Sequence, residues 1–254
     1  MHTFFRTSFT NVWNLRKKET LDRNGRRNKR QNSKKKLSNI SGLASHASSM
    51  LLEIHPCNPQ PRYINQVIDV LQNDGVIIYP TDTVYGLGCN IYSKKALKKI
   101  SLIKDVDAKR HLTFICSSLQ QIQEYSQGID TAVFKILKRH LPGPYTFLFR
   151  ASKIVPKLLL TKRSTIGVRW PDQIIATQIV SELGNPILSS SLYSGEDHLF
   201  DNAWEIHEEF GKQVDLVIDG REIFAEHSTI IDFTTDVPEV IRIGKGQINW
   251  LDQI

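Results

Sequence analysis

The sequence lacks the long apolar runs of a membrane protein. No apolar stretch reaches the roughly 18 residues that span a bilayer. The N-terminus also lacks the apolar segment and small-residue cleavage site of a secretory signal. We therefore expect a cytoplasmic protein with no membrane attachment.

Cysteine is scarce, and its spacing excludes two common structural devices. Cys57, Cys89 and Cys116 are odd in number, far apart and free of CxxC or Cys–His patterns. Such spacing supports neither a disulfide framework nor a zinc site. We expect three reduced, buried thiols.

Several familiar catalytic signatures are missing as well. The chain has no GxxxxGK[ST] loop, no GxGxxG after a strand, no HExxH and no GxSxG. A P-loop enzyme, a Rossmann dehydrogenase, a zincin and an α/β-hydrolase therefore all lose their main support. No catalytic nucleophile and no protein metal site are predicted.

Composition and charge divide the chain into two parts. Its 254 residues, 40% of them apolar and 9% aromatic, suffice for one large α/β domain or two small ones. The formal net charge is +7, but residues 1–50 hold twelve Lys and Arg against two acids. The remaining residues hold 21 basic and 24 acidic side chains, so the positive excess lies entirely in the first fifth.

The basic segment has no apolar periodicity, so we predict a disordered extension over residues 1–49 and a folded domain over 50–254. Three interpretations of the extension compete. It can bind RNA phosphates, or it can be an organellar transit peptide. The preferred interpretation is an upstream extension, or a mispredicted start, because compact sequence begins at Met50.

From Met50 onward, helical and strand patterns alternate. Helices are expected over 64–75, from Ser93, from Asp130 and over 173–184, where the apolar residues recur with helical spacing. The predicted extended segments are 76–79, 112–116, 145–150, 165–169, 186–192, 214–219, 228–232 and 240–243. Helices alternating with strands early, and strands crowding late, predict an α/β fold with a twisted mixed sheet flanked by helices.

Small hydroxyls and single cations stand where these strands and helices end. They are Thr81, Thr83, Lys104, Thr165, Arg169, the serines 189–191, Ser228, Thr229 and Arg242. Taken singly, each has an ordinary structural explanation, such as filling space, capping a turn or complementing a helix dipole. Strand ends converge on one crevice in open α/β sheets. A crevice of this composition suits an anionic, hydroxyl-rich ligand such as a nucleotide with a small amino acid.

The order of these residues resembles the YrdC-like family of threonylcarbamoyl-AMP synthases, and most closely its YciO branch. The resemblance covers about residues 54–248. Its motifs are YPTDTVYGLG (79–88), IK (103–104), LPGPYTFLF (141–149), TIGVRWP (165–171), PILSSSLYSG (186–195), STIID (228–232) and VIRIGKG (240–246).

The resemblance implies a twisted α/β sheet around a concave cleft, and a role for each matching residue. Thr83, Arg169, Ser189 and Ser228 are the expected contacts of L-threonine, with Arg169 on its carboxylate. Lys104, Thr165, Ser191 and Arg242 are the expected nucleotide contacts.

The implied reaction joins L-threonine, bicarbonate and ATP into threonylcarbamoyl-AMP and pyrophosphate, for modification of transfer RNA. Mg²⁺ is expected with the ATP. Asp82 is the one candidate ligand for that metal, although a role in forming the turn is the stronger interpretation.

The sequence departs from the synthase pattern at two places. Synthases carry Lys-x-Arg where this chain has Lys104-Asp105-Val106, and Ser-x-Asn where it has Ser191-Leu192-Tyr193. Two side chains that are expected to contact the phosphates of ATP in the synthases are thus replaced. The alternative function is therefore a nucleotide- or RNA-binding module of the YciO type without efficient synthase activity.

Overall fold

The structure is a computed structural model that describes residues 49–104, 112–160, 164–193, 198–235 and 237–251. Residues 46–254 form one unit of the chain, and the description concerns that unit. Of the predicted extension, only Ser49 is described. It is buried, and its amide donates a 2.9 Å hydrogen bond to the carbonyl of Gly211. Asp105 and Val106 lie outside the described residues.

The described residues form helices and strands in alternation, as the sequence patterns predict. The helices are α2 (Pro61–Gln72), α3 (Lys94–Lys104), α4 (Leu119–Tyr125), α5 (Thr131–His140), a 3-10 turn η2 (Lys157–Leu159), α6 (Ile174–Leu183) and α7 (Ala203–Phe210). The strands are β1 (Met50–Glu53), β2 (Val76–Tyr79), β3 (Gly86–Asn90), β4 (Thr113–Ile115), β5 (Ser126–Gln127), β6 (Tyr145–Ala151), β7 (Thr165–Arg169), β8 (Ile187–Ser191), β9 (Leu216–Asp219), β10 (Thr229–Asp232) and β11 (Glu239–Arg242).

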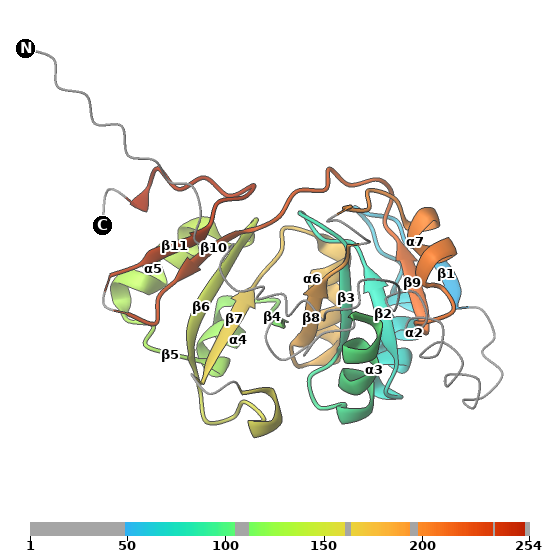
Figure 1. The fold of residues 1–254 in the computed structure, drawn as a ribbon, viewed down its shortest axis with the longest axis horizontal. Helices are drawn as coiled ribbons and strands as arrows, with labels where there is room; N and C mark the ends of the chain where they lie inside the picture. Colours follow the sequence, from blue (N-terminus) through green and yellow to red (C-terminus); the bar gives the residue numbers. More distant parts are fainter. Residues whose placement is uncertain (1–48, 105–111, 161–163, 194–197, 236, 252–254) are drawn as a thin grey trace, which may run out of the picture. The chain divides into compact units, whose positions relative to one another are not determined.

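All of these strands belong to one mixed sheet (Figure 1). Its order is β1-β9-β2-β3-β8-β4-β7-β6-β10-β11, with β5 paired to β6. Strand β4, for example, pairs in parallel with β7 and antiparallel with β8. The predicted α/β fold with a mixed sheet flanked by helices is therefore confirmed.

Local signals explain where the helices begin and end. Helix α2 has proline at its first turn and buries Ile64, Val67, Ile68 and Leu71 along one face. Helix α5 begins after Asp130, whose carboxylate accepts a 2.8 Å hydrogen bond from the amide of Val133. Helix α6 ends at Gly184, which takes the left-handed conformation with φ of 76°.

Strand β3 was not predicted, because two of its five residues are glycine, which is rare in strands. The tertiary structure requires these glycines. A Cβ atom on Gly86 would lie 2.8 Å from Ser189 Oγ, and one on Gly88 would lie 2.8 Å from the Tyr79 ring. Helices α4 and α7, also missed, are short, with seven and eight residues.

The two faces of the sheet are covered differently. On one face α2 and α6 pack against Ile77, Tyr79, Ile115 and Ile187. This apolar cluster contains no residue of β7, β6, β10 or β11. A larger cluster, which includes Phe114, lies on the opposite face. The face under α2 and α6, called the site face below, therefore lies outside this apolar cluster along β7, β6, β10 and β11.

Two further expectations concern cysteine and the membrane. Cys89 and Cys116 are buried free thiols, and burial raises the pKa of Cys89 to about 12. Cys57 is exposed, so the prediction of burial was wrong for this residue, which lies in a loop before α2. In the described part of the chain, no helix has the length and apolar character needed to cross a membrane.

Candidate functional site

Sheet register places six of the eight predicted ligand-binding residues on the site face. Adjacent side chains alternate between faces along a strand, and the pairing of the strands aligns this alternation across the sheet. The six residues on this face are Thr165, Arg169, Ser189, Ser191, Ser228 and Arg242. Gly86, Gly88 and Gly167 lie on the same face. Because glycine has no side chain, nothing projects from the sheet at these three positions.

Thr81 and Thr83 stabilise the turn between β2 and β3. The Thr81 hydroxyl donates a 2.6 Å hydrogen bond to the carbonyl of Val84 and accepts one of 3.1 Å from the amide of Thr83. The two threonine hydroxyls are 3.2 Å apart. Thr83 is fully buried, and its hydroxyl contact with Thr81 lies within the turn.

Arg169, at the end of β7, forms an ion pair with Asp82 of this turn. The contact joins Nη2 of the guanidinium to Oδ1 of the carboxylate, and Nη2 also lies 3.4 Å from Thr81 Oγ1. Their side chains are 7% and 10% exposed. Asp82 is therefore engaged by a cation, which argues against the metal-ligand role considered for it.

Ser189, in the middle of β8, accepts a 2.7 Å hydrogen bond from the Tyr79 hydroxyl. Both residues are buried, and burial raises the pKa of Tyr79 above its ordinary value. Tyr79 is thus a neutral donor. It holds the Ser189 hydroxyl in place across β3, because the glycines of β3 leave room for the ring.

Ser228 and Arg242 form a second polar cluster beside Arg169. Arg242 donates to the carbonyl of Ser228 from Nε (3.1 Å) and Nη2 (2.9 Å), and to its hydroxyl at 3.2 Å. The Ser228 hydroxyl also lies 2.9 Å from that of Thr146. Burial, and next the nearby Arg169, lower the pKa of Arg242. Arg242 thus adds a positive charge near the Arg169–Asp82 pair, which favours an anionic ligand.

Lys104 ends α3, and its ammonium donates a 2.8 Å hydrogen bond to the carbonyl of Ser191. The ring centre of Tyr193 lies 3.3 Å from the same nitrogen. Burial lowers the pKa of Lys104 to about 8. The structure therefore brings Lys104 and Ser191 together, but it joins Arg242 to Ser228, a residue assigned to the other ligand. Thr165 begins β7 and is half-buried.

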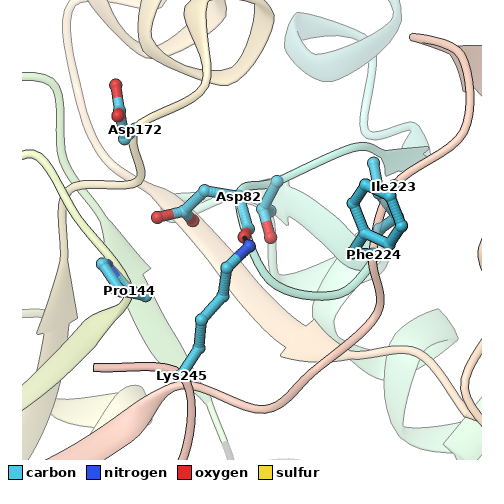
Figure 2. A pocket seen from close by; sticks show the side chains of 7 residues that line it. Asp82, Pro144, Asp172, Ile223, Phe224 and Lys245 are labelled. Carbon is cyan, nitrogen blue, oxygen red and sulfur yellow. Dashed lines mark hydrogen bonds between the residues drawn. The ribbon is translucent and has the colours of Figure 1, made fainter. Parts of the chain in front are cut away.

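A pocket of about 340 Å³ lies beside the turn that holds Asp82 (Figure 2). Its lining residues are Thr81, Asp82, Pro144, Asp172, Ile223, Phe224 and Lys245. The ammonium of Lys245 donates a 2.6 Å hydrogen bond to the carbonyl of Asp82. Phe224 is 92% exposed, and Figure 2 shows its ring on the opposite side of the pocket from Pro144.

Sequence reasoning missed several of these lining residues. Pro144 and Lys245 lie within quoted motifs, LPGPYTFLF and VIRIGKG, and Asp172 follows TIGVRWP directly, so motif membership was a usable signal. Ile223 and Phe224 lie in a segment without regular structure between β9 and β10. Only the tertiary structure brings that segment to the pocket.

The described residues do not fit a protein-held metal ion. Among them, no group of three or more His, Cys, Asp or Glu side chains could hold a metal. Asp82 and Asp172 line the pocket, but Asp82 is paired with Arg169.

Comparison with known proteins relates the sequence to one family. The model of the family Sua5_yciO_yrdC, described as "Telomere recombination", matches residues 69–244. "Uncharacterized protein YciO" of Escherichia coli K12 is 40% identical over 202 residues, which are 79% of this chain and 98% of that protein. The threonylcarbamoyl-AMP synthase of Pyrococcus abyssi is 30% identical over 180 residues, 70% of this chain and 53% of that enzyme.

Solved structures agree with this assignment. The crystal structure of E. coli YciO matches with a TM-score of 0.75 over 79% of this chain and 98% of that chain, at 40% identity. P. abyssi Sua5 complexed with L-threonine matches with a TM-score of 0.75 over 81% of this chain and 60% of that chain, at 25% identity. The predicted YrdC-like fold is confirmed, and this chain belongs to the Sua5/YciO/YrdC family.

Proposed function

We propose that this chain is an L-threonylcarbamoyladenylate synthase-like nucleotidyltransferase. It would condense L-threonine, bicarbonate and ATP to threonylcarbamoyl-AMP and pyrophosphate, for modification of transfer RNA. The observation that carries the proposal is the pair of buried or half-buried guanidinium groups, Arg169 and Arg242, among small hydroxyls on one sheet face. Support also comes from the similarity to a Sua5 protein solved with L-threonine.

The proposed chemistry needs position and positive charge rather than a covalent nucleophile. Bicarbonate and the threonine amine form a carbamate with loss of one water molecule, and a carbamate oxygen then attacks the α-phosphorus while pyrophosphate leaves. Arg169 would hold the threonine carboxylate, and Ser189 and Ser228 would contact the same ligand. Arg242 and Lys104 would neutralise charge on the phosphates, which enter as the magnesium complex of ATP.

The experiment that tests this function is pyrophosphate release from ATP by the full chain. Release should require both L-threonine and bicarbonate, and omission of either should reduce it to background. L-2-aminobutyrate serves as the matched control, because it has the same carboxylate, amine and carbon skeleton without the hydroxyl. Release that is independent of threonine would argue against the proposal.

A second candidate is a nucleotide- or RNA-binding module without efficient chemistry. It is favoured by Tyr193, whose ring covers the ammonium of Lys104 where the synthase pattern has asparagine. A cation needed for phosphate is thus already occupied by a neutral aromatic ring. ATP binding without threonine-dependent pyrophosphate release would support this candidate.

A further inference from the structure

Asp82 stands between the pocket and Arg169, the predicted clamp on the threonine carboxylate. Asp82 lines the pocket, whereas Arg169 does not. Arg169 is only 6% exposed, so its guanidinium is closed off on the pocket side by the carboxylate of the turn. A ligand that enters this pocket therefore meets Asp82 before it meets Arg169.

The ion pair is incomplete on both sides. Among the described residues, Oδ2 of Asp82 and Nε of Arg169 are buried without a hydrogen-bond partner. A fully matched arginine–carboxylate pair uses two parallel N–H···O bonds, which adds both energy and directional fit. This pair has one such contact, from Nη2 to Oδ1. A carboxylate with better geometry can therefore compete for the guanidinium.

The backbone around Asp82 is held, while its side chain has space beside it. Lys245 binds the carbonyl of Asp82, and the amide of Glu226 donates a 3.1 Å hydrogen bond to the carbonyl of Thr83. Figure 2 shows the Asp82 carboxylate pointing toward the side of the pocket where Asp172 and Pro144 lie. Side-chain rotation into the pocket thus requires no rearrangement of the turn.

We propose that Asp82 is an internal carboxylate that occupies Arg169 in the free protein and is displaced by the carboxylate of the substrate. The exchange keeps the buried guanidinium paired throughout, which matters because an unpaired buried charge is strongly destabilising. It also makes Asp82 a specificity-determining residue, since a ligand without a carboxylate cannot take over Arg169. The identity of the ligand as L-threonine rests on the function proposed above.

The first test compares L-threonine with L-threoninol, which has a hydroxymethyl group in place of the carboxylate. In Asp82→Asn the internal competitor is lost, so calorimetry should show threonine binding tighter by about tenfold, as expected if the pair is closed about nine-tenths of the time. Threoninol binding should stay unchanged. Asp172→Asn is the matched control, because it removes a carboxylate from the same pocket wall. An equal gain in that variant would mean a general charge effect and would overturn the proposal.

The second test uses stability, because Asp82→Asn leaves a buried guanidinium unpaired and should melt at a lower temperature than the parent. Threonine should restore more of the melting temperature in this variant than it adds to the parent. Sodium acetate should also raise the melting temperature of Asp82→Asn more than that of the parent, when each is compared with sodium chloride at equal ionic strength. This measurement involves no threonine.

These measurements distinguish the carboxylate exchange at Arg169 from the proposal that L-threonine is the substrate. Threonine that binds the parent, with equal or weaker binding to Asp82→Asn, would mean that Asp82 only positions Arg169. Stabilisation of the variant by acetate, with no binding of threonine to either protein, would keep the carboxylate exchange and reject the proposed substrate. A variant that neither acetate nor threonine stabilises more than the parent rejects the exchange.

Discussion

The ammonium of Lys104 lies 3.3 Å from the centre of the Tyr193 ring, although the two residues are far apart in the sequence. The aromatic face and the carbonyl of Ser191 take up two directions around this nitrogen. Tyr193 itself is 38% exposed. The availability of the Lys104 ammonium to a phosphate therefore depends on the position of this partly exposed ring.

The lowered pKa of Lys104 predicts a pH dependence of ATP binding. The side-chain amine of Lys104 is mostly protonated, and therefore charged, below its pKa of about 8 and mostly neutral above it. If only the charged form binds phosphate, ATP affinity should fall by about tenfold between pH 7 and pH 9. Binding titrations at several pH values measure this. Lys104→Arg is the control, since arginine stays charged over the whole range; the same decline in that variant would exclude Lys104 as its origin.

The departures from the synthase pattern predict a gain of activity. Val106→Arg together with Tyr193→Asn restores the cation and the amide that synthases carry near the phosphates of ATP. Val106 lies outside the described residues. Each contact is worth roughly 1.5 to 3 kcal/mol in the transition state. Threonine-dependent pyrophosphate release should then rise by about two to four powers of ten. Tyr193→Asn alone is the matched single variant, and it should also uncover Lys104.

An increase of less than threefold in the double variant, with ATP still bound, would favour the binding module. Such a result would mean that the cleft serves another ligand even when the side chains that bind the phosphates of ATP are restored.

Arg242 should affect both ligands, because it contacts Ser228 and its charge interacts with that of Arg169. Arg242→Ala should weaken ATP binding by roughly 2 kcal/mol, as expected for charge-assisted hydrogen bonds. It should also weaken threonine binding, since Ser228 loses the donors that fix its position. Arg169→Ala is the comparison and should weaken threonine by a similar amount but ATP less. Unchanged binding of both ligands to Arg242→Ala would remove it from the site.

The glycines of the site face predict a contrast in stability. Gly86→Ala places a methyl group 2.8 Å from Ser189 Oγ and 2.9 Å from the Tyr79 ring, so it should lower the free energy of unfolding by about 1 to 3 kcal/mol. Gly167→Ala, on the same face, meets its nearest side chains at 3.4 Å and should change the free energy by less than about 1 kcal/mol. Urea denaturation measures both. Equal stability of the two variants would show that the crowding at Gly86 is relieved without cost.

Several features of this protein are determined by its local sequence. The helical spacing of apolar residues in α2, the cap at Asp130 and the glycine exit at Gly184 lie within a few residues of the structure that they produce. Alternation along the strands likewise implies that Thr165 and Arg169 share a face. The motif order was sufficient to identify the family, because it collects residue types whose spacing reflects a shared fold.

Other features depend on contacts between distant segments, which only the tertiary structure decided. Asp82 and Arg169 are 87 residues apart, and Tyr79 and Ser189 are 110 apart. These pairs form because β3, β8, β4 and β7 are neighbours in an order unlike their order in the chain. The same long-range approach makes glycine necessary in β3, where local propensity argues against a strand. Local patterns specify which residues face the sheet, but the register between distant strands decides which charges meet there.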